Sequence, residues 1–144
     1  MKIVIGSDHA GFELKEQLVN YLQEKYKVVN CGTYSKDSVD YPDYAKAVCL
    51  EMNENTVGIL VCFTGIGMSI AANKFKGVRA ALVGSVEDAK LTREHNNANV
   101  LCLSSKNTPF ELAKKIVDTF LTTEFTYGRH ENRVNKILKI EEEN

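Results

Sequence analysis

The sequence predicts an α/β domain in which one parallel sheet lies between two layers of helices. Five short apolar runs, rich in β-branched residues, predict buried strands. The segments between them repeat apolar residues at helical spacing. Strands that alternate with helices imply right-handed crossovers, which make the sheet parallel and cover both of its faces. No linker, repeat or low-complexity tract divides residues 1–144, so we expect a single domain.

The predicted strands are short and evenly distributed along the chain. They cover residues 2–6, 26–29, 57–62, 78–83 and 99–103. Residues 33–40 are polar and irregular, which predicts a long connection before the next helix. The order of the strands within the sheet does not follow from these patterns.

The predicted helices have clear apolar faces. Their apolar positions are Leu14, Leu18 and Leu22; Ala45, Val48, Cys49 and Met52; and Leu112, Ala113, Ile116, Val117, Phe120 and Leu121. Ser85 is the expected N-cap of one helix, with Asp88 three residues later, and Thr108 is the expected cap of another, with Pro109 in its first turn. The whole predicts a three-layer αβα sandwich of Rossmann-like architecture with an extra C-terminal helix.

Composition excludes several classes of protein. The formal net charge is −1, which gives no electrostatic reason to expect a nucleic acid or an anionic membrane as the main partner. No apolar run approaches the length of a membrane span, and no signal-peptide pattern precedes the first strand. We therefore expect a cytoplasmic protein.

The four cysteines, Cys31, Cys49, Cys62 and Cys102, are far apart and form no C-x-x-C pair. This spacing argues against a zinc site or a redox dithiol. Cys49 and Cys102 fall in predicted core segments, where a thiol behaves as a small buried hydrophobe. Cys62 is different because it falls where the central predicted strand ends.

The segment after Cys62 is a glycine-containing turn, Thr64-Gly65-Ile66-Gly67. It lacks the third glycine of a dinucleotide fingerprint, because position 70 is isoleucine, and it lacks the G-K-[ST] ending of a P-loop. What remains is a tight strand-to-helix turn whose N–H groups can hold an anion or a developing oxyanion. Such a turn is more often structural than functional when it is considered alone.

Other reactive side chains are expected at the same edge of the sheet. Asp8 and His9 follow the first strand, and we expect His95 and Asn96, from the helix before the fifth strand, to join Cys62 there. An Asp-His pair directly after a buried strand has no evident packing purpose, although ordinary surface turns also contain these residues.

The last helix, expected from about Arg129 to Ile140 before the solvated run 141–143, begins with positive charge. Arg129 and Arg133 are four residues apart and share one helix face, where they can clamp a phosphate dianion. The alternative is a solvated basic face. Three scattered histidines without spaced carboxylates form a poor ligand set, so we expect no metal site.

Taken together, these residues resemble the type B ribose-5-phosphate isomerases, a metal-independent family that includes allose- and galactose-6-phosphate isomerases. The resemblance covers nearly the whole chain. It is carried by residues 6–11 (GSDHAG), 40–45 (DYPDYA), 64–74 (TGIGMSIAANK), 93–96 (REHN) with 98–101 (ANVL), and 128–130 (GRH) with 133–134 (RV). The family interconverts an aldose phosphate and its ketose through a cis-enediolate, without a cofactor. The resemblance thus implies a place in the pentose phosphate pathway.

The resemblance also implies roles for the candidate catalytic residues. Cys62 would be the base that moves a proton between C2 and C1. The enediolate oxygen would be stabilised by Thr64 and by the backbone N–H groups of residues 63–67. These N–H groups belong to Phe63, Thr64, Gly65, Ile66 and Gly67. His95 would open the furanose ring by acid catalysis, and Asp8 would hold the hydroxyls or the ring oxygen of the sugar.

For substrate binding and assembly, the resemblance implies a site shared between subunits. His9, Arg129 and Arg133 would bind the phosphate, and Asn96 would contact the sugar. The family places its active site at a homodimer interface, with His95 and Asn96 contributed by the partner chain. A monomer would then be inactive, and a tetramer is equally compatible with the sequence.

Two positions depart from the family pattern. The usual Cys-Gly-Thr-Gly has Phe63 in place of its first glycine, which could narrow the site or change the preferred sugar length and would be strained at a positive φ. Lys106 stands where many members have an arginine after the fifth strand. A lysine can meet a phosphate only as a point charge, so Lys106 either binds it more weakly or does not contribute.

Two alternatives remain open at this stage. The first keeps the reaction and changes the substrate to a hexose phosphate, such as allose 6-phosphate. The galactose 6-phosphate branch fits less well. Its enzymes divide the motif residues between two different subunits, whereas this one chain carries them all. The second alternative is a non-catalytic flavodoxin-like or receiver-like binding module, but a phosphoacceptor pocket needs clustered aspartates, and only Asp8 lies at a predicted strand end.

Overall fold

A sheet of five parallel strands, in the order β2-β1-β3-β5-β4, forms the centre of the computed structural model, which describes residues 1–144. The strands are β1 (Lys2–Ser7), β2 (Lys27–Asn30), β3 (Thr56–Cys62), β4 (Ala80–Leu82) and β5 (Val100–Ser104). In the middle, β3 pairs with both neighbours, because Ile59 aligns with Ile5 of β1 and with Leu101 of β5. The structure therefore confirms the predicted five-stranded parallel sheet and supplies its strand order.

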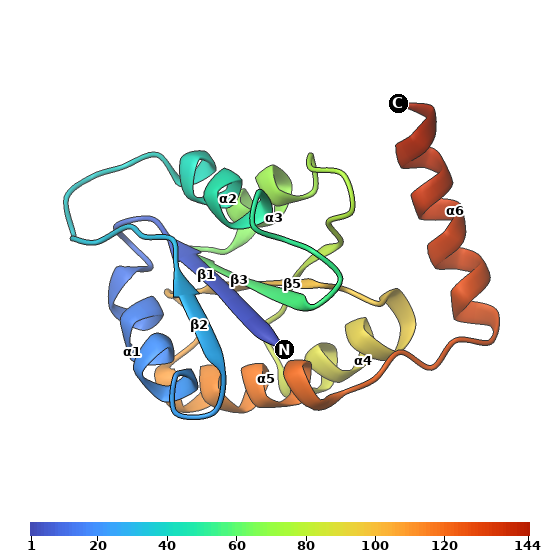
Figure 1. Ribbon diagram of the computed structural model, residues 1–144. Helices are drawn as coiled ribbons and strands as arrows, with labels where there is room; N and C mark the ends of the chain where they lie inside the picture. The colour runs from blue at the N-terminus through green and yellow to red at the C-terminus, as the bar shows by residue number, and fades with distance from the viewer.

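Helices cover both faces of this sheet, as Figure 1 shows. Two of them, α2 (Tyr41–Cys49) and α3 (Ile66–Ala72), lie on one face. The other face is covered by α1 (Phe12–Leu22), α4 (Val86–Asn96) and α5 (Phe110–Thr122). The last helix, α6 (Arg129–Glu143), stands outside these layers, on the side of the sheet where the N-terminus lies. The predicted sandwich with an extra C-terminal helix is confirmed.

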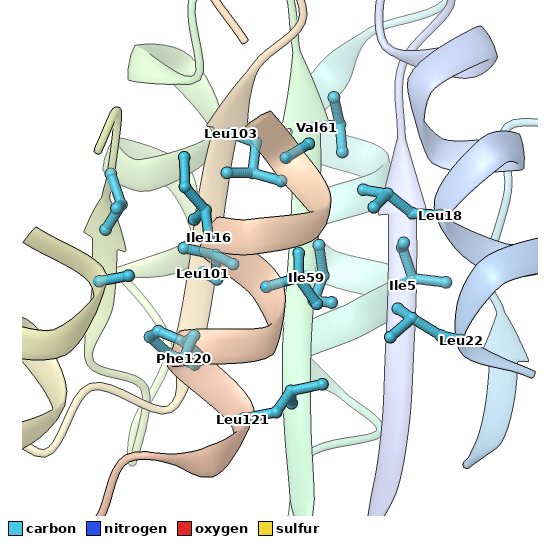
Figure 2. Packing of buried hydrophobic residues seen from close by; sticks show 14 of the residues in the cluster. Ile5, Leu18, Leu22, Ile59, Val61, Leu101, Leu103, Ile116, Phe120 and Leu121 are labelled. Atoms are coloured by element: carbon cyan, nitrogen blue, oxygen red, sulfur yellow. The ribbon is translucent and has the colours of Figure 1, made fainter. Parts of the chain in front are cut away.

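Two apolar cores hold the three layers together, one on each face of the sheet. Successive residues of a strand point to opposite faces, so Ile59 and Val61 of β3 enter the first core, while Leu60 and Cys62 enter the second. Figure 2 shows the first core, in which side chains from the strands meet those of α1 and α5. Burial on both faces explains why β3 is a continuous apolar run.

One predicted helix start is wrong in detail. Thr108 does not cap α5: Pro109 occupies the N-cap position, and the Thr108 hydroxyl is buried without a hydrogen-bond partner. The chain is instead held by its backbone, because the Thr108 N–H donates to the Ser104 carbonyl at 3.0 Å. By contrast, the predicted cap at Ser85 is confirmed, since its hydroxyl accepts from the Asp88 N–H at 3.1 Å.

Several element boundaries differ from those expected. The run 141–143 continues α6 rather than ending it, and Lys74 and Met52 fall just beyond the ends of α3 and α2. At the sheet edge, β4 is shorter than residues 78–83, because only Ala80 to Leu82 pair with β5. Terminal turns and edge strands gain little from tertiary packing, which leaves their ends poorly specified by pattern. None of the helices is long and apolar enough to cross a bilayer.

The N-terminus of α1 lies directly against the end of β3. A Cβ atom added at Gly11 would lie 2.4 Å from the Val61 carbonyl oxygen, so only glycine permits this contact. The close approach holds the turn that follows β1 beside the last residue of β3. Because that turn begins with Asp8, the packing of α1 helps to hold Asp8 next to Cys62, the residue that ends β3.

We predict that Gly11→Ala lowers the free energy of unfolding by about 1–3 kcal/mol, because the new methyl group must displace the backbone of β3 or α1. Urea denaturation measures this change. The matched control is Gly84→Ala, where an added Cβ meets nothing within 4 Å. The control should change stability by no more than about 1 kcal/mol. Equal stabilities of the two variants would contradict the close-contact explanation.

Candidate active site

The first group of candidate residues lies at the carboxyl edge of the sheet, where β1 and β3 end side by side. Ser7 aligns with Val61, so Asp8 emerges next to Cys62. The Asp8 N–H also donates to the Val61 carbonyl at 3.3 Å. Asp8 as a whole is 7% exposed, and its Oδ1 accepts from the Gly11 N–H at 3.0 Å. Its second oxygen has no partner in the chain and is available to a ligand.

Cys62 differs from two of the other thiols in its place at the end of a strand, and not in how deeply it is buried. Desolvation raises the pKa of Cys49 to about 11 and raises the pKa of Cys102 further, with the neighbouring Cys62 and Cys49 adding to the effect at Cys102. Both of these thiols are core residues, as the sequence predicted. Cys62 is 5% exposed but ends β3 at the sheet edge, where the next residues turn towards solvent.

The glycine turn after Cys62 has a tightly fixed backbone. Gly65 has a φ of 77° and a space too small for a side chain, since a Cβ there would lie 2.5 Å from Leu82 Cδ1. The Thr64 hydroxyl accepts from the Ile66 N–H at 3.2 Å. Of the turn's amides, that of Ile66 is therefore already engaged within the chain. We define Asp8, Cys62, Thr64 and Gly65 as the thiol cluster.

Phe63 and Lys106 lie together beside the thiol cluster. Strain at Phe63 does not arise, because the non-glycine residues with positive φ are Asn97 and Tyr127. The Phe63 carbonyl accepts from the Lys106 N–H at 2.9 Å, and the Lys106 ammonium lies 5.6 Å from the centre of the Phe63 ring. Phe63 is 54% exposed and directly follows Cys62, so it lies at the surface beside the end of β3.

The second group of candidate residues surrounds the start of α6. The rings of His95 and His130 stack with their centres 4.2 Å apart and their planes at 13°. The connection to α6 is fixed to the end of α4, because Thr126 donates to the Glu94 carbonyl from both its N–H and its hydroxyl, at 3.2 and 2.8 Å. We define His95, Arg129, His130 and Arg133 as the basic cluster; Asn96 is exposed at the end of the same helix, α4.

The surroundings of His130 disfavour a positive charge on its ring. Desolvation of the half-buried ring lowers the pKa of His130, and the positive charges of His95, Arg129 and Arg133 lower it further. Glu94 acts in the opposite direction. Two arginines and a second histidine are therefore close enough to one imidazole to disfavour its protonation, and an anionic ligand would offset this effect.

The expectation that His95 and Asn96 lie at the same edge as Cys62 is wrong within one chain. Each crossover helix runs antiparallel to the strands, so α4 ends at the amino edge, where β5 begins at Val100. Cys62 aligns with Ser104 at the other end of β5. A strand of five residues spans about 16 Å, which is too far for the two clusters to share one small ligand. In Figure 1, α6 and the N-terminus mark the amino edge.

Sequence reasoning missed one buried residue of α1. Lys15 is completely buried, and its ammonium donates to the Thr33 carbonyl at 2.7 Å. The signal was present, because Lys15 is three residues before Leu18 and seven before Leu22 and therefore falls on the apolar face of its helix. The location of His9 after β1 is as predicted, and its ring is half-buried.

Comparison with known proteins gives consistent matches over the length of the chain. A model of the ribose/galactose isomerase family matches residues 3–137. Ribose-5-phosphate isomerase B of Escherichia coli K12 is 46% identical over 144 residues, which cover 98% of this chain and 97% of the relative. The chain is therefore similar to these proteins throughout, and not in one motif alone.

Solved structures show the same similarity in three dimensions. A ribose 5-phosphate isomerase of Thermotoga maritima is 56% identical, with a TM-score of 0.93 over 96% of this chain and 97% of that one. Ribose-5-phosphate isomerase B of Mycoplasma genitalium, solved with bound ribulose-5-phosphate, is 45% identical with a TM-score of 0.95 over 99% and 97%.

We predict that His130 titrates below the ordinary histidine pKa of about 6.5 and that Arg133→Gln raises its pKa towards that value. The unfolded chain binds this proton at a higher pH than the folded chain. Acidification between the two pKa values therefore lowers the free energy of unfolding. Histidine NMR titration measures the shift. Lys136→Gln, a change on the same helix outside the basic cluster, should leave the pKa of His130 unchanged. If Lys136→Gln raised this pKa as much as Arg133→Gln, the effect would not come from the basic cluster.

Proposed function

Because the chain belongs to the ribose/galactose isomerase family, we propose that it interconverts ribose 5-phosphate and ribulose 5-phosphate through a cis-enediolate, without a metal ion. The observation that carries this proposal is the near-complete match to the Mycoplasma genitalium structure that holds ribulose-5-phosphate. The curated relative from Escherichia coli, named for the same pentose substrate, favours the five-carbon sugar over the hexose alternative.

Cys62 is the proposed base that carries a proton between C2 and C1 of the sugar. Its location supports this role, because it ends the central strand beside the free carboxylate oxygen of Asp8. Cys49 and Cys102 cannot replace it at neutral pH, since burial raises the pKa of both thiols. Asp8 would hold the sugar through its hydroxyls or ring oxygen while the proton moves.

The turn after Cys62 is the proposed site for the negative charge of the enediolate. Backbone N–H groups of this turn, supported by Thr64, would donate to the developing oxyanion. The fixed backbone at Gly65 favours this role, because donors that are already oriented need no reorganisation during the reaction. Loss of one such donor costs on the order of 3 kcal/mol in other enzymes.

The remaining proposed groups must come from a second copy of the chain. The basic cluster lies at the opposite edge of the sheet from the thiol cluster, so one site that uses both needs two chains. In a two-fold dimer, the same contact forms twice and creates two equivalent sites. His95 of the second copy would open the ring, and its Asn96 would contact the sugar. Its Arg129 and Arg133 would bind the phosphate. His9 and Lys106 of the first copy, the latter beside Phe63, would bind the same phosphate.

The C-terminal helix offers surface for such a contact. Ile137 and Ile140 of α6 are 49% and 60% exposed, which is unusual for large apolar side chains that follow helical spacing. Between α6 and the body of the domain lies an open groove of about 790 Å³, which these two residues help to line. A second chain that brought its carboxyl edge to the basic cluster would cover part of this region.

We predict that Cys62→Ala lowers kcat for ribose 5-phosphate by about 10²–10⁴, the usual contribution of a general base. An aldose–ketose assay with a chelator present measures this loss, and the wild type should remain active. The control Cys31→Ala, at a half-buried thiol, should retain activity. Full activity of Cys62→Ala would refute the assigned base, and loss of wild-type activity on chelation would refute metal independence. Parallel assays on allose 6-phosphate test the hexose alternative.

A second prediction tests the shared site directly. Dimers that combine one Cys62→Ala chain with one His95→Gln chain, isolated after co-expression with two different tags, carry one intact site of two. They should show about half of wild-type activity, although each parent variant is inactive.

The reciprocal control places both changes on one chain and pairs it with a wild-type chain. If the site is shared, each site of this mixed dimer has one defect, and the dimer is inactive. If each chain builds its own site, the control keeps about half of wild-type activity. The dimer of one Cys62→Ala chain and one His95→Gln chain is then inactive. That second pattern would refute the shared site.

A further inference from the structure

Lys15 is a buried cation that the proposed reaction does not use. Its side chain is 0% exposed, and its ammonium has three acceptors: Thr33 O at 2.7 Å, Glu16 Oε2 at 2.9 Å and Asn30 Oδ1 at 3.1 Å. It also lies between the rings of Phe12 and Tyr34, 5.0 and 5.6 Å from their centres. Because an ammonium has three protons, every donor is occupied, and Lys15 serves to fix its surroundings.

What Lys15 fixes is the start of the long connection between β2 and α2. The Thr33 N–H donates to the Ser7 carbonyl at 2.7 Å, and the Ser7 N–H donates to the Gly32 carbonyl at 2.7 Å. The Lys15 ammonium then holds the Thr33 carbonyl. The connection therefore continues the pairing with the end of β1, directly before Asp8 and His9.

The far end of the same connection touches His9. The Val39 N–H donates to His9 Nδ1 at 3.1 Å. A nitrogen that accepts a hydrogen bond carries no proton, so the single proton of the neutral ring must be on Nε2. An imidazolium has protons on both nitrogens and could not accept this bond. The Val39 amide thus favours the neutral ring protonated on Nε2. It disfavours the other two states, which are the neutral ring protonated on Nδ1 and the imidazolium.

We propose that the loop of residues 33–40, anchored at Thr33 by the buried Lys15, holds His9 through the Val39 N–H as the neutral tautomer protonated on Nε2. His9 then binds an anionic group as a neutral, directed donor, and the positive charge for that group comes from other residues. Lys15 and Val39 are positioning residues in this scheme. The step from tautomer to phosphate binding rests on the proposed function, whereas the tautomer itself does not.

The direct test is the ¹⁵N NMR spectrum of the histidine rings of the full chain at pH 7.5, with His9 assigned from a His9→Gln sample. We expect His9 to show a protonated Nε2 and an unprotonated Nδ1. A protonated Nδ1, or an imidazolium, would overturn the proposal. This measurement does not need isomerase activity, so it is independent of whether the chain acts on ribose 5-phosphate.

Variants at Val39 separate the backbone donor from the side chain. Val39→Pro removes the N–H and should give a mixture of the two neutral tautomers, whereas Val39→Ala keeps the N–H and should give the wild-type spectrum. An unchanged spectrum in Val39→Pro would overturn the role of the amide. For the substrate, we expect Val39→Pro to raise KM about two- to tenfold, the range for loss of one directed hydrogen bond.

A Lys15→Met variant tests the anchor, because it keeps the apolar stem and removes all three donors. We expect faster hydrogen exchange at the Val39 amide and the same mixture of His9 tautomers. Lys25→Met, a change at an exposed lysine after α1, should change neither. If Lys15→Met folds and retains the wild-type His9 spectrum, the anchor is refuted; if it does not fold, the Val39 pair still decides the role of the loop.

Discussion

The direction in which each connecting helix crosses the sheet decides where the candidate residues next to the strands lie. Parallel strands require each connecting helix to run back along the sheet, so residues that follow a strand reach the carboxyl edge and residues that precede one reach the amino edge. Asp8 and His9 follow β1 and Cys62 ends β3, whereas His95 precedes β5. The distance between the thiol cluster and the basic cluster is therefore a consequence of topology. The proposed dimeric site would reconcile this distance with chemistry on one small substrate.

Similar side chains of this protein lie in different surroundings. Three of the cysteines have a pKa raised mainly by desolvation, and two of these three, Cys49 and Cys102, are in the second core. Cys62 shares that core but ends its strand beside a turn of backbone donors. In the same way, Lys106 extends its ammonium over an exposed ring, whereas the ammonium of Lys15 is completely enclosed. Location relative to the end of a strand, more than residue type, separates the proposed reactive groups from the structural ones.

The loop between β2 and α2 connects stability with function. A buried lysine is costly unless its charge has acceptors, and here all of them belong to α1, to the end of β2 or to the loop itself. The same charge that had to be satisfied for folding therefore orders a segment without regular secondary structure. That segment reaches the imidazole of His9, which lies next to the carboxylate of Asp8 in the sequence.

The sequence by itself determined the α/β class, the succession of strands and helices, and most of the candidate residues, because periodicity and turn chemistry are local properties of the chain. The strand ends at Asp8 and Cys62, the cap at Ser85 and the core positions of Cys49 and Cys102 were all predictable in this way. Only the tertiary structure decided the strand order, the separation of His95 from Cys62 and the enclosure of Lys15. It also decided that the Thr108 hydroxyl has no hydrogen-bond partner. These features depend on which distant segments pack together and in which direction, and no local pattern contains that information.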